Sequence, residues 1–529
     1  MQDKFRRLTI VFVVFAISML MLVYYSVEKS GMFIDEIYSY GLSNGEYTPF
    51  ITDVYERDII DKIYTSEQLT DYLIVDEDEG FDYGSVYYNQ TKDVHPPLYY
   101  FMLNEVCSVF RGGFTKWTGL ALNMVIHFMT LLLLYKTAKK LFSSETVPPL
   151  VVFLYGLSSM GLSTALMIRM YCLSTMFSVL LLYLLISYGE CKRWYKAVFI
   201  GLTVFAGLMT HYYFVIYAFI LCFVFLIRFI RRREYKAAVG FAVPAFAGVG
   251  AMVAVFPAVI DHLFSDKLVS GESAVSNIAD PLGYPKRIAK FALDIINEMP
   301  VVVLVGIILL VYVVILARNK KIDLKAYLSR THAVGVTVSV VVALCAAAIL
   351  APVHTSRYIY NLAPAFVIVA GYLMDMVFGA DVKSKAHSVM TTVIVSVTVI
   401  LSFAGAYIIS PDYLFPEQIE INETVSEYSD SVCIYFNDNY NSPLTQDLLQ
   451  LRQFDEVFVT NSAESDALEE YLAGKSDASS VVVYVDVSKF WSSGFDAEEV
   501  IGEFMGKFGY TSYEVMYKYG LSETYVVTK

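Results

Sequence analysis

Runs of about twenty apolar residues recur along this chain and constrain its fold more than any other feature. A helix of that length crosses a hydrocarbon layer of about 30 Å. The chain has 529 residues, of which 56% are hydrophobic and 17% charged. Soluble domains carry about 25% charged residues. The sequence therefore predicts a polytopic α-helical membrane protein.

The topology follows from the number of these runs and from the positions of Lys and Arg, because basic loops stay in the cytoplasm. We count eleven candidate spans: 8–25, 117–136, 147–166, 170–188, 196–210, 212–230, 237–258, 299–317, 333–351, 357–378 and 388–409. With eleven spans one side receives every basic cluster: 4–7, 136–140, 192–193, 231–236, 318–325 and 383–385. If 196–230 formed one kinked span instead of two, half of these basic clusters would fall on the opposite side of the membrane. We expect a cell-membrane protein with a cytoplasmic N-terminus and an extracytoplasmic C-terminus.

The first run has the basic start of a signal peptide. Its apolar core is longer than the usual length of about 7–15 residues, and the following YYSVEKSG contains no small-x-small cleavage site. We expect this segment to be retained as a membrane anchor.

Three parts of the chain lie outside the expected spans. They are a long first external loop, 26–116, a shorter one, 261–298, and a soluble part, 410–529. We therefore divide the chain into a membrane domain, 1–409, which includes loop 26–116, and an extracytoplasmic domain, 410–529. The last part carries 22 acidic against 6 basic residues, so it accounts for the chain's net charge of −13. Such a surface argues against nucleic acid or anionic lipid as a partner.

The C-terminal part alternates strand-like and helix-like segments. Buried strands are predicted at 431–437, 456–460 and 481–487, and helices at 442–454, 465–473 and 496–509. This order indicates a small α/β sheet with crossover helices. The segment contains no glycine-rich phosphate-binding pattern, which favours a recognition or packing role over chemistry.

Ionisable and aromatic side chains gather in five segments that the predicted topology places on the outer side. Each alone has an ordinary explanation, such as a solvated turn, a proline break or an interfacial anchor. Together on one face they favour a single site. They are Asp35 and Glu36 in FIDEIYSYG, Asp93 and His95 in DVHPPLYYFMLN, Arg169 and Tyr171 in IRMY, His211 and Tyr212 in THYYF, and His354, Arg357 and Tyr358 in PVHTSRYIY.

These residue types suit one kind of chemistry. A partly buried carboxylate can act as a general base toward a hydroxyl. Arginine matches phosphate oxygens with a planar fork of donors, and histidine donates to phosphate or, together with carboxylates, ligates a metal. Tyrosine faces suit sugar rings. At the outer membrane surface, this set predicts a site for a phosphorylated lipid that carries a sugar.

At these residues the chain resembles the GT-C superfamily of integral-membrane glycosyltransferases. Within it, the chain is most similar to bacterial relatives of glycosyltransferase family 39, the dolichyl-phosphate-mannose protein mannosyltransferase and aminoarabinose transferase group. The resemblance covers about residues 8–410 and leaves out 410–529. The segments that carry it, in order, are FIDEIYSYG, DVHPPLYYFMLN, IRMYCLS, THYYF and SRYIYNLAPAF.

The resemblance implies a GT-C fold of about eleven transmembrane helices and a polyprenyl-phosphate-linked sugar donor. Asp35 would then be the base that deprotonates an acceptor hydroxyl, with inversion at the anomeric carbon, and Glu36 would support it or orient the acceptor. The lipid tail would lie in a groove between spans. The remaining residues divide into donor-phosphate ligands, namely Arg357, Arg169, His211, His354 and Tyr358, and residues that shape the site or bind a metal, namely Asp93, His95, Tyr171 and Tyr212.

The sequence leaves the sugar, the lipid length, the metal requirement and the acceptor open, whether glycan, lipid or protein. Loop 261–298 is too short for the sugar-binding insert of the eukaryotic protein mannosyltransferases, which weakens a protein acceptor. A flippase or transporter would place charges near the midplane, where these spans are apolar. A polymerase of lipid-linked saccharides shares external arginines but has no need of DE followed by HPPLYY. A receptor leaves the five segments unexplained.

Overall fold

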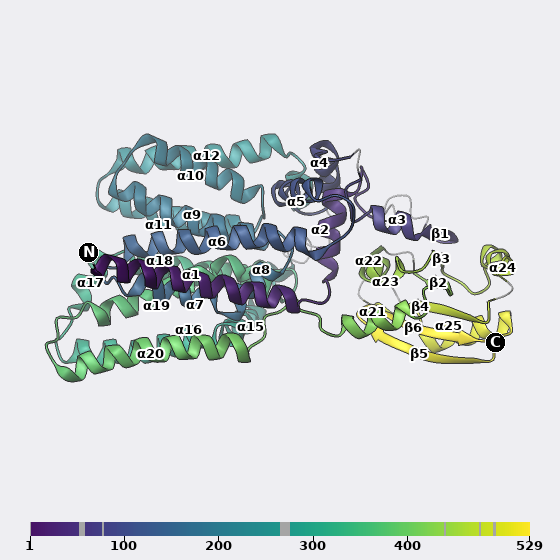
Figure 1. The fold of residues 1–529 in the computed structure, drawn as a ribbon. Helices are drawn as coiled ribbons and strands as arrows, with labels where there is room; N and C mark the ends of the chain where they lie inside the picture. Colours follow the sequence, from purple (N-terminus) through teal and green to yellow (C-terminus); the bar gives the residue numbers. More distant parts are fainter. Residues whose placement is uncertain are drawn as a thin grey trace. The chain divides into compact units, whose positions relative to one another are not determined.

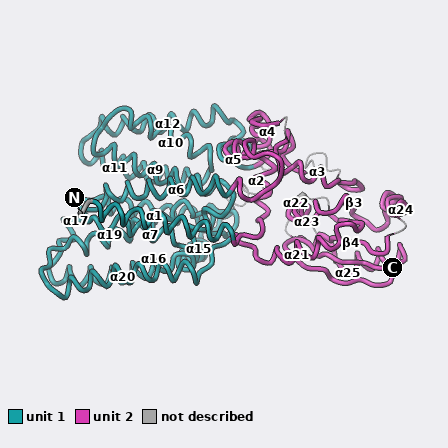
Figure 2. Tube along the Cα trace, viewed as in Figure 1, with its two compact units in different colours: residues 1–27, 94–99, 120–412 teal, residues 28–93, 100–119, 413–529 magenta. Residues whose placement is uncertain are grey.

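The computed structural model describes residues 2–51, 59–76, 79–264, 276–438, 441–475, 478–489 and 494–529. The chain forms two compact units (Figure 2), and its course alternates between them. The helical unit comprises residues 1–27, 94–99 and 120–412, and the α/β unit comprises residues 28–93, 100–119 and 413–529. The α/β unit thus includes most of the first long loop, 26–116, which the predicted division assigns to the membrane domain.

The helical unit contains helices of membrane-spanning length (Figure 1). Within the described residues nine helices are long and apolar enough to cross a membrane. They are α1 (Gln2–Glu28), α6 (Lys116–Leu141), α9 (Tyr171–Glu190), α11 (Phe214–Arg231), α12 (Tyr235–Val255), α16 (Pro300–Arg318), α18 (Ala333–Leu350), η2 with α19 (Ser356–Leu362 and Ala363–Phe378) and α20 (Lys385–Ile408).

The two remaining expected spans are helical but differ in form. The span predicted at 147–166 is a pair, α7 (Val147–Gly156) and α8 (Ser159–Leu166), bent by 58°. Ser158 stops one helix and caps the next by accepting a hydrogen bond from the Gly161 amide. The span predicted at 196–210 is the 15-residue α10 (Trp194–Leu208). The prediction of a polytopic helical membrane protein is confirmed.

Small residues let the helices of this unit pack closely. Helix α10 lies against α12, and a Cβ at Gly248 would stand 2.3 Å from the Gly201 carbonyl oxygen. Such close backbone contact is the usual way for helices to associate in lipid, where burial of apolar surface gives no driving force. Shorter helices connect the long ones: α13 (Val259–Phe264), η1 (Pro281–Gly283), α15 (Tyr284–Glu298) and α17 (Leu324–Arg330).

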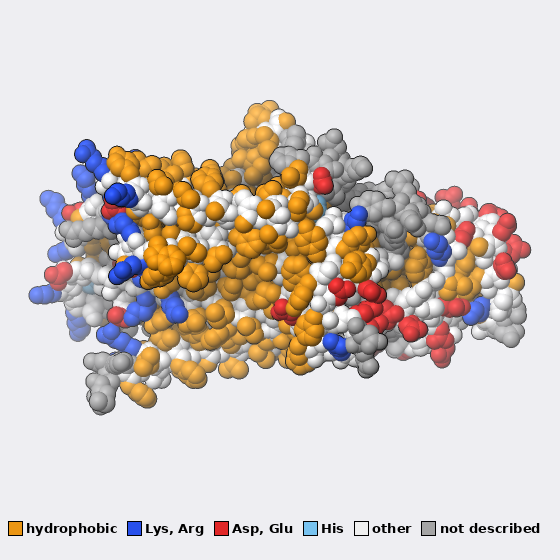
Figure 3. Space-filling view, turned by 90° about the horizontal axis from the view of Figure 1, so that it is seen from above, with side chains coloured by type: hydrophobic (Ala, Val, Ile, Leu, Met, Phe, Trp, Pro, Cys, Tyr) orange, Lys and Arg blue, Asp and Glu red, His pale blue; other side chains and the backbone are white. Residues whose placement is uncertain are grey.

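Lys and Arg gather at one end of the helical unit, with hydrophobic side chains along its flank (Figure 3). Ion pairs join the loops at this end. Glu145 contacts Arg7 at 3.5 Å and Lys139 at 3.2 Å, and Lys140 contacts Glu190 at 2.5 Å. The basic loops therefore meet at one end of the unit, as the predicted topology requires.

The α/β unit has one six-stranded sheet, with strand order β1-β3-β2-β4-β6-β5. The central strands β3, β2 and β4 are parallel, and the strands at both edges pair antiparallel. The strands are β1 (Lys62–Thr65), β2 (Val432–Phe436), β3 (Glu456–Thr460), β4 (Ser480–Asp486), β5 (Ser512–Tyr519) and β6 (Ser522–Thr528). Its helices are α2 (Ile34–Asn44), α3 (Ser66–Asp71), α4 (Tyr83–Lys92), α5 (Leu98–Val109), which begins in the helical unit, α21 (Gln418–Ser426), α22 (Asn441–Gln446), α23 (Leu448–Leu451), α24 (Asp466–Ala473) and α25 (Ala497–Phe508).

The three predicted strands and the crossover arrangement are confirmed. Ile434, Phe436 and Val483 lie in the core on the sheet face that α24 and α25 cover. The helix expected at 442–454 is instead two short helices, α22 and α23, since the chain turns at Asp447. The terminal hairpin β5–β6 and strand β1 were not predicted. Strand β1 comes from the first long loop and pairs with β3.

Candidate active site

Four of the five polar segments converge in the helical unit. The first of them, 94–99, contains Pro96 and Pro97, which cannot donate backbone hydrogen bonds and keep the chain out of a helix. The Leu98 amide donates to the Met209 carbonyl oxygen at 2.9 Å. This bond holds the segment against the turn between α10 and α11, which carries His211. The His-Pro-Pro motif thus brings His95 to a second predicted segment.

Asn123 of α6 fixes the third segment. Its side-chain nitrogen donates to the carbonyl oxygens of Ala165, in the last turn of α8, at 3.0 Å and of Met167, in the break between α8 and α9, at 2.7 Å. Its oxygen accepts a hydrogen bond of 3.1 Å from the Tyr99 hydroxyl. Asn123 is fully buried, so one side chain ties the break that carries Arg169 to the segment that carries His95.

The side chains on these segments contact one another. Arg169 Nη2 lies 3.3 Å from His95 Nδ1. The rings of His95 and His211 stack with centroids 6.1 Å apart, and Tyr171 meets His211 edge-on at 5.2 Å. Arg169 and His211 are only 4% and 5% exposed. The arrangement is a buried group of nitrogen donors lined by aromatic rings.

The fourth segment adds Arg357. Its guanidinium lies 5.9 Å from the Tyr358 ring centroid, and that ring packs 4.7 Å from Tyr213. Burial lowers the pKa of His211 well below its usual range, and the charges of His95, Arg169 and Arg357 lower it further. His211 is therefore neutral at pH 7, in a positive local field that favours an anion. We call His95, Arg169, His211 and Arg357 the His–Arg cluster.

The His–Arg cluster lies far from the basic end of the helical unit. Tyr171 begins α9, and Glu190, which pairs with Lys140, ends it. A 20-residue helix is about 30 Å long. The cluster and the basic loops thus occupy opposite ends of a helix that matches the thickness of a hydrocarbon layer.

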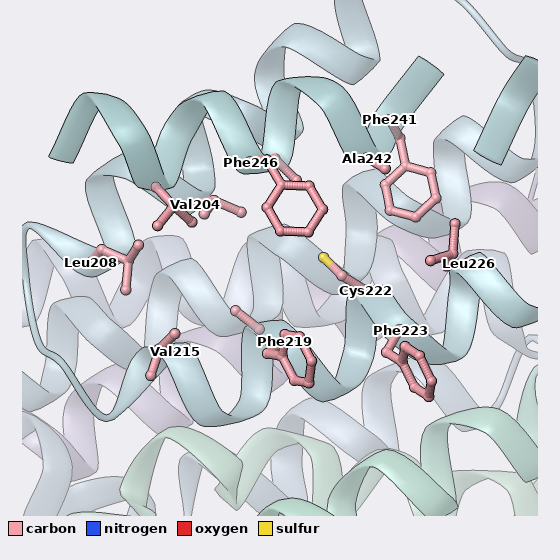
Figure 4. Close-up of a pocket in the computed structure, with 13 residues that line it drawn as sticks. Val204, Leu208, Val215, Phe219, Cys222, Phe223, Leu226, Phe241, Ala242 and Phe246 are labelled. Atoms are coloured by element: carbon pink, nitrogen blue, oxygen red, sulfur yellow. The ribbon is translucent and has the colours of Figure 1, made fainter. Parts of the chain in front are cut away.

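An apolar groove runs along α10, α11 and α12 from the turn that carries His211. Leu208 and Val215, which flank this turn, line one end of it, and Leu226 and Phe241 line the other (Figure 4). Phe219 projects from the middle and is 63% exposed. The lining is apolar almost throughout, so the groove suits a hydrocarbon chain.

The fifth segment lies in the α/β unit. Asp35 is in the first turn of α2 and is partly exposed. Burial raises the pKa of Tyr38, and the charges of Asp35 and Asp93 raise it further, so both carboxylates act on the same phenol. Glu36 is fully buried, and its Oε2 accepts a 2.9 Å bond from Lys29 Nζ. The Asp35 side chain is therefore partly exposed to solvent, whereas Glu36 is buried in an ion pair.

Comparisons with known proteins agree with this fold. A family model described as dolichyl-phosphate-mannose-protein mannosyltransferase matches residues 94–260. The structure of ArnT from Cupriavidus metallidurans bound to undecaprenyl phosphate is similar with a TM-score of 0.53 at 9% identity, covering 98% of this chain and 97% of that chain. About a third of the chain thus matches this family model, and the fold is similar to that of ArnT over nearly the whole chain.

The apo oligosaccharyltransferase of Archaeoglobus fulgidus is similar with a TM-score of 0.45 at 10% identity, over 90% of this chain and 69% of that chain. No curated protein matches the sequence significantly. The family match itself spans His95, Arg169 and His211 of the His–Arg cluster.

Two predicted site residues have partners outside the cluster. His354 Nε2 lies 2.9 Å from Asp294 Oδ2 on α15. The Tyr212 hydroxyl lies 2.9 Å from His262 Nδ1 on α13. Both contacts bind a connecting helix to a site segment, so in this structure these two side chains hold the segments in place.

Sequence reasoning missed Asn123 and Glu298. Glu298 ends α15, and its pKa is raised to about 8 by burial, while Ser356 hydrogen-bonds to it and Asp412 and Asp294 add negative charge. An acidic residue directly before the apolar run of α16 is a sequence signal for a functional carboxyl group at the end of a membrane span. Asn123 gave no signal, because an isolated amide in a span carries no pattern.

Within the described ranges, no three His, Cys, Asp or Glu side chains are grouped so that they could hold a metal ion. Asp93 and His95 are fewer than the three protein ligands of a catalytic zinc site. We therefore assign no step of the reaction to a metal.

Proposed function

We propose that this protein is a GT-C-type glycosyltransferase that transfers a sugar from a polyprenyl-phosphate-linked donor to an acceptor hydroxyl on the outer face of the cell membrane. One observation carries the proposal: the His–Arg cluster, in which Arg169 and His211 are buried, stands at the end of an apolar groove, at the opposite end of α9 from the basic loops. An anionic head on a hydrocarbon tail fits both features.

The proposed donor-phosphate ligands are Arg357 and Arg169. Their guanidinium groups stay charged when buried, and charge-assisted hydrogen bonds to phosphate are strong. Neutral His211 can donate one N–H to the same oxygens, and His95 and Tyr358 complete this end. As the lipid phosphate departs, the cluster stabilises its growing negative charge.

The groove of α10–α12 is proposed to hold the lipid tail. The ArnT structure, which has a similar fold, contains undecaprenyl phosphate, and the matching family model is named for a dolichyl-phosphate-linked sugar. Both support a polyprenyl phosphate for this chain. Basic loops face the cytoplasm in membrane proteins, so the cluster at the opposite end of α9 would face outward.

The proposed base is Asp35. It would take the proton from the acceptor hydroxyl while the acceptor oxygen attacks the anomeric carbon opposite the phosphate. The carbon–oxygen bond to the phosphate breaks, polyprenyl phosphate leaves, and the configuration inverts. Asp93 would accept hydrogen bonds from the sugar or acceptor. Glu36 is buried in an ion pair with Lys29, so it would support the position of Asp35.

The α/β unit is proposed to help select the acceptor. Tyr38, one turn after Asp35, lies 3.3 Å from the Ser442 hydroxyl of α22 and packs edge-on against Phe50 at 5.9 Å. Partly buried aromatic rings beside hydroxyl and carboxylate oxygens suit a sugar. A glycan acceptor is therefore favoured.

The test is release of free polyprenyl phosphate from a panel of radiolabelled polyprenyl-phosphate sugars, with and without chelator. Purified wild type should cleave one donor, and Asp35→Asn should not. Asp71→Asn, on an exposed carboxylate of the same unit, is the matched control and should behave as wild type. Equal release by wild type and Asp35→Asn would remove Asp35 as the base. Movement of an intact donor across liposomes without cleavage would support a flippase, and transfer of whole chains a polymerase.

A further inference from the structure

We propose that the C-terminal α/β domain sets the position of Asp35 through a buried clamp of Lys29, Glu36, Gln418 and Tyr519. In this clamp Glu36 is a positioning residue. The inference rests on the proposed role of Asp35 as base, and it makes residues 413–529 a working part of the site in addition to any role in acceptor choice.

The first half of the clamp is an ion pair with fully buried side chains. Glu36 Oε2 accepts from Lys29 Nζ at 2.9 Å and from the Phe33 amide at 2.8 Å. Lys29 Nζ also donates to the Tyr413 carbonyl oxygen at 2.6 Å and lies 5.3 Å from the Phe415 ring centroid. A buried pair holds firmly when its remaining polar atoms are satisfied. This pair therefore ties the start of α2 to the segment that leads into the C-terminal domain.

The second half of the clamp is one amide side chain. Gln418 Oε1 accepts from the Met32 amide, and its Nε2 donates to the Met32 carbonyl oxygen, both at 3.3 Å. The same Nε2 donates to the Tyr519 hydroxyl of β5 at 2.7 Å. A Cβ at Gly31 would stand 2.2 Å from Gln418 Oε1, so the contact needs a glycine there. Gln418 thus bridges the chain before α2 to the last hairpin of the protein.

Asp35 sits between the anchored residues. Phe33 is the N-cap of α2, and Glu36 bonds to its amide from the third helical position. The backbone on both sides of Asp35 is therefore held by the C-terminal domain, while its own side chain is partly exposed. A base displaced by about 1 Å can lose about 100-fold in rate. Loosening the clamp should therefore lower kcat without changing donor affinity.

The test compares two alanine substitutions in the full-length protein. Gln418→Ala removes the bridge. Gln450→Ala is the matched control, because Gln450 has the same 3% exposure and donates to Asn422 at 2.9 Å inside the same unit. We expect Gln418→Ala to lower kcat for transfer about ten-fold with an unchanged donor KM. Gln450→Ala should keep the wild-type kcat even if its melting temperature falls equally. Gly31→Ala, which displaces Gln418, should reproduce the kcat loss.

A second readout does not depend on activity. Amide hydrogen exchange over α2, residues 34–44, should rise in Gln418→Ala and stay at the wild-type level in Gln450→Ala. Unchanged exchange over α2 in Gln418→Ala overturns the clamp. Raised exchange with an unchanged kcat overturns its role in positioning the base. If wild type cleaves no donor but exchange over α2 rises, the clamp stands as structure and the proposed function fails.

Discussion

The side-chain nitrogen of Asn123 donates a 2.7 Å hydrogen bond to the carbonyl oxygen of Met167, two residues before Arg169. Asn123 is fully buried in the first third of α6, where an amide is costly unless all its hydrogen bonds are made. Because its oxygen also accepts from Tyr99, this one residue sets the distance between two segments of the His–Arg cluster.

Asn123→Asp should weaken donor binding, since a carboxylate cannot donate to the two carbonyl oxygens. We expect an increase of about ten-fold in donor KM and a loss of about 1–3 kcal/mol in stability from the buried unpaired groups. Steady-state kinetics and thermal unfolding in detergent measure these effects. Asn44→Asp, which breaks a buried amide bond to Leu73 in the other unit, should lower stability while leaving donor KM unchanged.

Arg357→Lys should lower kcat/KM for the donor by about 10–100-fold, because lysine keeps the charge but loses the planar fork that matches a phosphate. Arg228→Lys, at a guanidinium that donates to the Thr331 carbonyl oxygen, is the control. An Arg357→Lys enzyme with wild-type kinetics would mean that Arg357 does not bind the phosphate.

Glu298 should make donor binding pH-dependent. Its pKa is raised to about 8 by burial, so the carboxyl group is neutral at pH 7 and becomes negative as pH rises through 8. The new charge lies beside Ser356, the residue before Arg357, and should repel the donor phosphate. Donor KM should therefore rise above pH 8 in wild type and stay flat in Glu298→Gln. A rise of equal size in both proteins would exclude Glu298 as its source.

The contributions of Lys29 and Glu36 to the free energy of unfolding should be strongly coupled. Lys29→Met or Glu36→Gln alone leaves a buried charge without its partner, which costs about 3–5 kcal/mol. The double variant removes both charges, so its loss in unfolding free energy should be well below the sum of the two single losses. Additive losses in thermal unfolding would show that the pair does not interact.

Asp447 should lower the stability of the α/β unit as pH rises. Burial raises its pKa from 3.8 to about 7, although the Tyr435 hydroxyl donates to it at 2.8 Å. The folded state therefore binds a proton that the unfolded state has already released, and the free energy of unfolding should fall between pH 4 and pH 7. Asp447→Asn should remove this fall and be more stable by about 1–3 kcal/mol at pH 8. The exposed Asp466→Asn should keep the wild-type pH profile.

Much of this architecture could be predicted from local sequence. Apolar runs gave the helical spans, and buried apolar segments gave β2, β3 and β4. Two spans took other forms, since Ser158 divides α7 from α8 and α10 has only 15 residues. The hairpin β5–β6 was missed because charged and exposed residues interrupt β5, as in SYEVMYKY, which hides its alternation. A four-residue strand such as β1 becomes recognisable only when β3 is beside it.

The sequence by itself determined the membrane class, the order of the five polar segments and the residue types of a phosphate site, because each of these depends on composition and local pattern. Only the tertiary structure decided that Asn123 joins two of those segments and that Lys29 neutralises Glu36 beside Asp35. It also decided that the first long loop shares a sheet with the C-terminal residues. These are contacts between residues far apart in the chain or in different segments, and their energies come from burial and hydrogen-bond geometry, which no local pattern encodes.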